Sequence, residues 1–241
     1  MSKLYRDDVI SVAQNEIGYM EKASDYDLDS KEGNAGHNNY TKYARDLWNA
    51  NPHFYQGPKN GYDWCTVFVD WCIYNACGWD STYAQNAKFY TGPYGAGCQF
   101  AAEYYKAAGA WYTSDPQPGD QIFFGYNGSF QHTGLVEKVE GSTVYTIEGN
   151  SNDMVRRNSY SLYSSYIIGY GRPCYDGNKR PEDCPFVDVP SDAWYHDAVM
   201  WGYENGITAG TDKEHFSPYK NITRAEVMQM LYKLNLSIEN K

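Results

Sequence analysis

The chain has 241 residues, a net charge of −10 and 42% hydrophobic residues, which is typical of a folded protein with more than one domain. Nucleic acids and anionic membranes require clustered Lys and Arg, so we expect neither as a partner of this acidic chain. No stretch approaches 18 apolar residues, and MSKLYRDDVISVAQNEIGY has no continuous apolar segment or small-residue cleavage site. We therefore expect no membrane span and, unless a signal is missing from the sequence, synthesis in the cytoplasm without a secretory signal.

The first part of the chain has the hydrophobic pattern of helices. Apolar residues recur at helical spacing in DDVISVAQNEIGY, where Gly18 provides a stop, and again in NNYTKYARDLW. A further helix is predicted in FAAEYYKAAG, which ends at Gly109. The N-terminal part is therefore predicted to be mainly α-helical.

The polar loop between the first two helices contains three alternating aspartates, Asp25, Asp27 and Asp29. They imitate the opening of a calcium loop, but Ser30 replaces its sixth-position glycine and Gly36 its twelfth-position glutamate. The six cysteines and five histidines show no metal-ligand spacing either. We expect a solvated loop, no metal and no cofactor, with His37 and His53 solvated although either could border a cleft.

Cys65 lies at the start of a predicted helix in GYDWCTVFVDWCIYNACG. The apolar face of this helix has a period of 3.6 residues and consists of Phe68, Val69, Cys72, Ile73 and Ala76. A cysteine at a helix N-terminus meets the positive end of the helix dipole, which favours the thiolate. A buried cysteine is also often a small hydrophobe, which we expect of Cys72 and Cys77. For Cys65 the residues alone leave both roles open.

The hydrophobic period changes after PQPGD. The segments QIFFGY, HTGLVEKVE and TVYTIEGN alternate or are apolar over short lengths, with turn residues between them. This pattern is typical of antiparallel strands. Helices followed by such strands predict an α+β fold for the first unit.

A cysteine nucleophile needs a histidine that holds its proton and a third group that orients the histidine. His132 begins a predicted strand, and Glu148 and Asn150 in IEGN are both suited to accept a hydrogen bond from an imidazole. The backbone N–H of Cys65 could donate to a developing oxyanion. A structural role for each residue remains the alternative.

The predicted hairpin places a condition on this arrangement. If VEGST closes as a two-residue turn at Gly141–Ser142, His132 and Glu148 project from opposite faces of the sheet, because side chains alternate along a strand. A three-residue loop or a β-bulge would bring them to the same face. We predict that one of these is present.

Four segments in this order resemble the CHAP family, the cysteine, histidine-dependent amidohydrolases/peptidases of bacterial cell walls and phage lysins: DWCTVFVDWC, PQPGDQIFF, QHTGLVEKVEGSTVYTIEGN and GYGRP. The resemblance covers about residues 5–173 and implies a papain-like fold. It implies Cys65 as nucleophile, His132 as general base, Glu148 as the acid that orients the imidazole, and Asn150 as a polar residue that completes the site. The calcium-binding acidic loop of some phage members is not matched by NPHFYQGPKNGYDW.

A change of composition near residues 172–185 indicates a linker, because RPCYDGNKRPEDCP has three prolines and no apolar periodicity. Cys174 and Cys184 flank a nine-residue loop there and could pair in an oxidising environment. We expect a catalytic domain over 1–173, a linker over 174–184 and a small module over 185–241.

The last unit has predicted helices over 192–204 and 224–234, and Thr223 and Glu226 form a capping box at the second start. From FVDVP through NGITAGT and FSP to ITRAEV, the unit resembles one S-layer homology (SLH) module. Such modules usually bind secondary polymers of Gram-positive cell walls and commonly occur in threes. A single copy implies weak binding, association of three chains into a trimer, or another role. The resemblance implies that Arg224 meets anionic polymer groups, with Trp194 near the groove.

Together these features predict a peptidoglycan hydrolase that acts at the bacterial cell wall. N-acetylmuramoyl–L-alanine amidase and peptidoglycan endopeptidase activities both occur among CHAP enzymes, and the sequence does not choose between them. The apparent lack of a signal favours a phage endolysin, released by a membrane-pore partner, over a secreted autolysin. The alternatives are a catalytically silent wall-binding protein and an amidase that acts on a small soluble amide.

Overall fold

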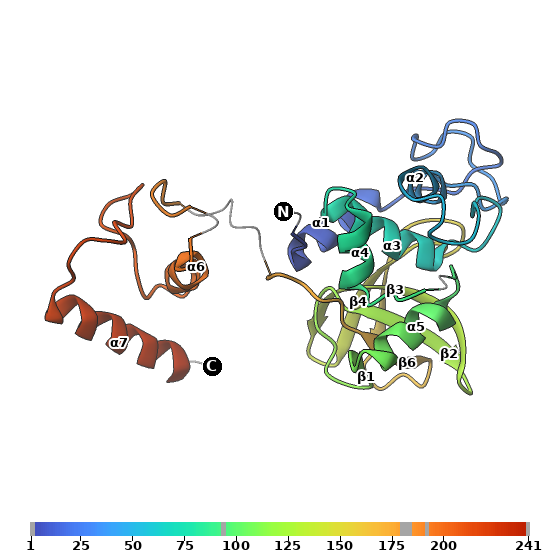
Figure 1. Cartoon of the computed structure of the whole chain (residues 1–241). Coiled ribbons are helices and arrows are strands. Elements are labelled where there is room, and N and C mark those ends of the chain that lie inside the picture. The colour runs from blue at the N-terminus through green and yellow to red at the C-terminus, as the bar shows by residue number, and fades with distance from the viewer. Residues whose placement is uncertain (1–2, 93–94, 179–184, 191–192, 240–241) are drawn as a thin grey trace. The chain divides into compact units, whose positions relative to one another are not determined.

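The computed structural model describes residues 3–92, 95–178, 185–190 and 193–239. The chain forms two compact units, Met1–Asn178 and Lys179–Lys241 (Figure 1). None of the described helices combines the length and the apolar composition that a bilayer crossing requires.

Five helices precede the sheet in the first unit: α1 (Arg6–Glu16), α2 (Lys42–Ala50), α3 (Cys65–Ala76), α4 (Ser81–Ala87) and α5 (Cys98–Ala107). Local chemistry sets several ends. The hydroxyl of Thr41 accepts a hydrogen bond from Ala44 N at the start of α2, and the carboxylate of Asp80 accepts one from Tyr83 N at the start of α4. Gly18, two residues after α1, has φ +89°, a conformation that glycine adopts readily. Four of the helices were predicted; the short α4 was not.

Helix α3 forms the centre of the first unit. Eleven of its twelve residues are buried, so the predicted apolar stripe is only one side of a helix that is covered all round. Its only charged residue is Asp70, which is fully buried and pairs with the ammonium group of Lys88. Tyr90 also donates to this carboxylate, at 3.0 Å.

The second half of this unit is a six-stranded sheet with the strand order β1-β6-β2-β3-β4-β5, all pairs antiparallel. The strands are β1 (Trp111–Tyr112), β2 (Gln121–Tyr126), β3 (Ser129–Glu140), β4 (Thr143–Glu148), β5 (Arg156–Ser161) and β6 (Ile167–Gly171). Phe123, Leu135 and Ile147 join the main core with the helices. The alternate residues Ile122, Phe124 and Val136 belong to a second cluster. The α+β fold is as predicted, although β1, β5 and β6 were not.

The hairpin of β3 and β4 contains the predicted irregularity. Glu140 pairs with Thr143 across a two-residue turn, the case in which a bulge is required, and the register shifts between Val136 and Lys138. Glu137 is therefore the extra residue of a β-bulge. The prediction is confirmed, and the parity change lies within β3 and not in the turn.

The second unit contains α6 (His196–Glu204) and α7 (Arg224–Glu239), with a small core of Phe186, Val189 and Val199. The predicted capping box is present, because Glu226 N donates to Thr223 Oγ1 at 3.2 Å and Thr223 N donates to Glu226 Oε2 at 2.7 Å. Helix α6 begins later than predicted.

The first five residues of the predicted linker pack against the first unit. Cys174 N donates to Ala87 O at 2.8 Å, and Asp176 N donates to Leu4 O at 2.9 Å. Residues 179–184 lie outside the described residues, and so does the predicted pairing of Cys174 with Cys184. Cys174 itself is exposed.

Candidate active site

Cys65 is the first residue of α3 and is only 7% exposed. Its position is fixed by the preceding Trp64, which is fully buried and whose indole N–H donates to Glu21 Oε2 at 2.9 Å. The carbonyl of Trp64 accepts the N–H of Phe68 at 2.9 Å and so starts the helix. The thiol therefore lies at a helix N-terminus, as predicted, where the dipole favours negative charge.

A second cysteine lies against this thiol. Cys98 is the first residue of α5, and its Sγ is 3.6 Å from the Sγ of Cys65. The hydrogen bond from Cys65 lowers the pKa of Cys98 to about 7, against the effect of burial, and the hydroxyl of Thr66 and the charge of His132 add to this. The same bond to Cys98, together with burial, raises the pKa of Cys65 well above its usual value. The pair thus loses its first proton readily, and the thiolate and thiol that result share the proton that remains.

His132 and Glu148 form a direct pair, with His132 Nε2 at 2.9 Å from Glu148 Oε2. A carboxylate only accepts hydrogen bonds, so Nε2 carries the hydrogen and Nδ1 is available for proton transfer. The imidazole also stacks on Phe124, with ring centroids 5.9 Å apart and planes at 24°. The bulge at Glu137 makes this pair possible, because it places both side chains on one face of the sheet.

Glu148 is 1% exposed and is held by three further side chains. Asn158 Nδ2 donates to Oε2 at 2.8 Å, the hydroxyl of Tyr160 lies 3.3 Å from the same oxygen, and Thr146 donates to Oε1. Burial, with the charge of Glu148, raises the pKa of Tyr160. The sequence analysis missed Asn158 and Tyr160, because β5 was not predicted. The available signal was their spacing of two residues in RRNSYS, which places both on the same face of a strand.

Asn150 does not join this pair. It has φ +55°, and its Nδ2 donates to Asp63 Oδ1 at 3.4 Å. Asn150 therefore links the loop after β4 to the segment just before Cys65, whereas the sequence analysis considered it as an acceptor for the imidazole.

The structure brings together His132 with Glu148, and Cys65 with Cys98. Among the described residues no hydrogen bond joins Cys65 to His132. Electrostatics connect the two pairs, because the charge of His132 contributes to the lowered pKa of Cys98. Burial raises the pKa of Tyr166, and the charges of Glu148, Cys98 and Cys65 add to that effect. Tyr166 is thus a neighbour of both pairs that the sequence did not indicate.

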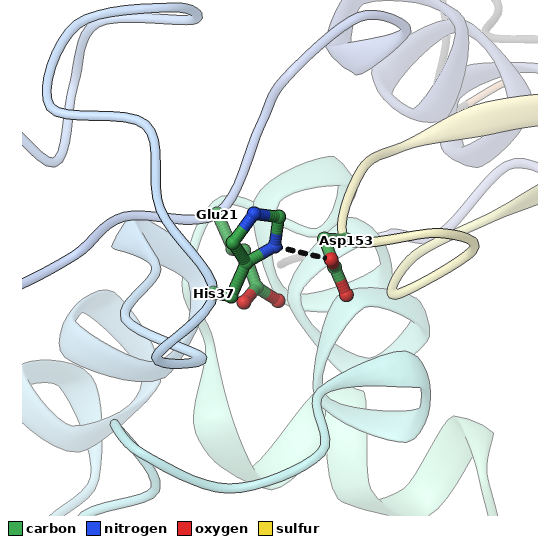
Figure 2. A group of neighbouring side chains, drawn as sticks. All are labelled: Glu21, His37 and Asp153. Atoms are coloured by element: carbon green, nitrogen blue, oxygen red, sulfur yellow. Dashed lines mark hydrogen bonds and ion pairs between the residues drawn. The ribbon is translucent and has the colours of Figure 1, made fainter.

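One group among the described residues could hold a metal ion. Glu21, His37 and Asp153 place one ligand atom each within 4.8 Å of one another (Figure 2). His37 Nδ1 is 2.6 Å from Asp153 Oδ2, although its side chain is 85% exposed, as expected of a solvated residue. Sequence spacing could not show this group, because its members come from distant parts of the chain.

The two residues predicted to bind polymer are both exposed. Trp194 is 90% exposed, with its ring 5.5 Å from that of Tyr195, and Arg224 is the first residue of α7. A groove of about 450 Å³ lies beside α7; its lining includes Thr208, Lys220, Gln229 and Lys233. Neither Trp194 nor Arg224 lines it.

Comparison with known families matches the CHAP domain to residues 57–150 and the S-layer homology domain to residues 185–228. The chain contains a CHAP domain and an SLH domain. The CHAP match includes Cys65, Cys98, His132 and Glu148, so both thiols and the imidazole–carboxylate pair fall within it.

The curated proteins that the chain resembles include S-layer proteins. A surface-layer 125 kDa protein of Lysinibacillus sphaericus is 45% identical over 49 residues, which is 20% of this chain and 4% of that protein. An S-layer protein of Bacillus thuringiensis subsp. finitimus is 33% identical over 93 residues, 36% of this chain and 11% of that protein. The chain thus spans only a small part of these relatives. Two crystal structures of Ly7917, one with the hydrolyzing product of MDP, are 14% and 16% identical and cover 70% of this chain and 62% of theirs, with TM-scores of 0.40.

Proposed function

We propose that this protein is a peptidoglycan hydrolase that cleaves amide bonds through Cys65, His132 and Glu148. The observation that carries the proposal is the 2.9 Å pair of His132 and Glu148 within a CHAP domain. A bulge in β3 creates this pair, and three side-chain donors hold its carboxylate. Cys65, at the N-terminus of α3 in the same domain, supplies the nucleophile.

The proposed reaction is an acyl transfer. The Cys65 sulfur leaves its contact with Cys98 and attacks the substrate carbonyl as a thiolate, and the backbone N–H of Cys65 donates to the oxyanion. Nδ1 of His132 takes the proton of the Cys65 thiol and gives it to the leaving amine; it then takes a proton from the water that hydrolyses the thioester and returns it to the Cys65 sulfur. Glu148 keeps the hydrogen on Nε2 and stabilises the imidazolium.

Lysis of Gram-positive cell walls tests this proposal. We expect the full chain to release soluble muropeptides from purified walls, and Cys65→Ala and His132→Ala to abolish release. Cys174→Ala is the matched control, because Cys174 is exposed in a different part of the unit. Equal release by the wild type and Cys65→Ala would support a catalytically silent wall-binding protein instead.

Mass spectrometry of the released fragments distinguishes the two bond types. A new free N-terminal alanine identifies an N-acetylmuramoyl–L-alanine amidase, and a cut stem or cross-bridge identifies an endopeptidase. Activity on soluble amides with none on walls would identify the small-molecule amidase. The presence of the SLH domain favours an insoluble substrate.

The proposed role of the SLH domain is to hold the enzyme at the wall through a secondary polymer, at or outside the cell surface. Arg224 would contact anionic groups, with Trp194 nearby. Walls stripped of secondary polymer should bind the chain less than untreated walls. Arg224→Ala should bind untreated walls less than the wild type does, so that its binding to the two kinds of wall differs less. Persistent binding to stripped walls would assign retention to the CHAP domain.

A different experiment concerns the origin of the enzyme. If cells that produce the chain in their cytoplasm lyse only when a membrane pore is also formed, that result would support a phage lysin.

A trimer through the single SLH domain is also proposed. Helix α7 exposes a row of apolar residues at helical spacing: Val227, Met228, Leu231, Tyr232 and Leu236. Three chains could cover these rows against one another. Light scattering during size-exclusion chromatography should show a mass three times that of the monomer, reduced by Leu231→Ser. A monomeric mass at all concentrations would exclude the trimer.

A further inference from the structure

Cys98 is a second buried thiol that the proposed reaction does not use. It is 8% exposed, starts α5, and is separated from Cys65 by 32 intervening residues in the sequence. Its sulfur nevertheless lies at 3.6 Å from that of the nucleophile. Two helix N-termini therefore bring two sulfur atoms to van der Waals contact at the catalytic position.

The separation is suited to a covalent bond between the two sulfurs. A disulfide bond is about 2.05 Å long, so the sulfurs must approach by roughly 1.5 Å, which side-chain rotation at two helix starts can supply. Cys77 does not compete for this contact, because its Sγ hydrogen bonds with Tyr74 O and Asp80 O at the other end of α3.

The pair also has the reactivity that oxidation requires. A thiolate, and not a thiol, attacks oxidants, and the contact with Cys65 brings the pKa of Cys98 to about 7. The hydroxyl of Thr66 lies 3.6 Å from Cys98 Sγ and supports its negative charge. At neutral pH a substantial fraction of the pairs therefore carries one thiolate beside one thiol.

We propose that Cys98 is the redox partner of Cys65, and that the Cys65–Cys98 pair is a site of covalent modification at which a peroxide closes a disulfide and blocks the nucleophile. This assignment rests on the proposed function for its effect on activity, since Cys65 must be the nucleophile for the disulfide to inhibit. The formation of the bond itself rests only on the contact of the two sulfurs.

The reaction balances in two steps. The thiolate sulfur attacks one oxygen of hydrogen peroxide, the O–O bond breaks, and sulfenic acid and hydroxide form. The neighbouring thiol then attacks the sulfenic sulfur, the S–O bond breaks, and water leaves with the proton of the thiol. In total, two thiols lose two electrons and two protons, and peroxide becomes two waters.

A dithiol reverses the modification. A thiolate of the reductant attacks one sulfur of the disulfide, the other cysteine leaves as thiolate, and the second thiol of the reductant releases the mixed disulfide. Cys98 would thereby protect the nucleophile, because a sulfenic acid formed on Cys65 in the absence of Cys98 meets no thiol at that contact and is oxidised further to the irreversible sulfinic acid.

Peptide mapping of the full-length protein tests the bond directly and does not depend on hydrolase activity. After treatment with hydrogen peroxide at neutral pH and alkylation of free thiols, we expect a cross-linked peptide that contains Cys65 and Cys98. Dithiothreitol should remove it. The proposal would be overturned if Cys65 or Cys98 becomes about 32 Da heavier, the mass of a sulfinic acid, and no cross-linked peptide forms.

Matched variants connect the bond to function. Each variant is compared with its own untreated activity on purified walls. Wild type and Cys77→Ser should lose most of their activity with peroxide and recover at least half with dithiothreitol, whereas Cys98→Ser should recover less than a tenth. Equal recovery by Cys98→Ser would overturn the protective role. If no variant shows any wall activity while the cross-linked peptide forms, the proposed function fails and the modification site stands.

Discussion

His132 Nε2 lies 2.9 Å from Glu148 Oε2 although the hairpin that carries them closes with a two-residue turn. The extra residue at Glu137 shifts the register so that Leu135 pairs with Ile147. Gly134 then lies opposite Glu148, and His132, two residues earlier, shares its face. A one-residue irregularity on the strand thus decides whether an imidazole and a carboxylate can meet.

Gly134→Ala should disable this pair. A Cβ at Gly134 would lie 2.4 Å from Glu148 Cγ and 3.0 Å from Ile147 O, so the glutamate must move away from His132. We expect wall-hydrolysis rates to fall by roughly 100-fold, as for other displacements of about 1 Å at reacting groups. Gly177→Ala is the control, because its Cβ would meet nothing closer than 3.6 Å. Full activity of Gly134→Ala would show that Glu148 need not occupy this position.

Asn158→Ala should lower the catalytic rate and leave substrate affinity nearly unchanged. Its amide donates to Glu148 Oε2 at 2.8 Å and to Ser151 Oγ at 3.0 Å, and so orients a carboxylate that is itself only 1% exposed. We expect kcat to fall by about tenfold, less than the ~100-fold or more lost with the acid–base group itself. Steady-state kinetics on a soluble muropeptide would separate the two parameters; a rise in KM with constant kcat would contradict the positioning role.

The sequence predicted the parts of this site that local pattern controls. Cys65 at a helix start follows from the apolar period of α3, and the need for a bulge follows from counting residues between His132 and Glu148. The position of the bulge did not follow, because a register shift is set by contacts across strands. Glu137, the bulged residue, accepts hydrogen bonds from Arg157 in β5 and from Gln14 in α1.

Contacts between distant segments likewise could not be predicted from the sequence pattern. Cys98 was assigned no role, because nothing in its own segment indicates that α5 begins against α3. Strand β5 was missed because RRNSYS is polar and its burial alternates between intermediate and exposed, so it lacks the apolar alternation of a core strand. The prediction therefore also missed Asn158 and Tyr160, two of the residues in β5 that hold Glu148.

Glu137→Gln should destabilise the protein at neutral pH and lose this effect in acid. Although burial opposes it, the hydrogen bonds from Arg157 and Gln14 and the charge of Arg157 hold the pKa of Glu137 below its usual value. A carboxylate with a lowered pKa contributes stability above its unfolded pKa of about 4.3, and this contribution disappears as the pH falls through the folded pKa.

Urea unfolding at pH 7 and at pH 3 measures this contribution. We expect Glu137→Gln to lose roughly 1–2 kcal/mol at pH 7, as for a hydrogen bond to a charged group, and much less at pH 3. Glu140→Gln, on the same strand, removes an exposed pair with Lys138 and should change stability little at either pH. A loss for Glu137→Gln that is equal at both pH values would mean that charge is not its cause.

Lys88→Met should be the most destabilising of these changes, since it leaves a charge unpaired in the core. Lys88 is 1% exposed and pairs with Asp70, which is fully buried within α3, the helix that begins with Cys65. Removal of one partner of a buried pair costs about 3–5 kcal/mol, whereas a neutral replacement of both costs far less. Thermal and urea unfolding of Lys88→Met and of Asp70→Asn/Lys88→Met should therefore differ, with the double variant closer to wild type. If the double variant unfolds as easily as Lys88→Met, the loss comes from packing around the lysine stem and not from the unpaired carboxylate.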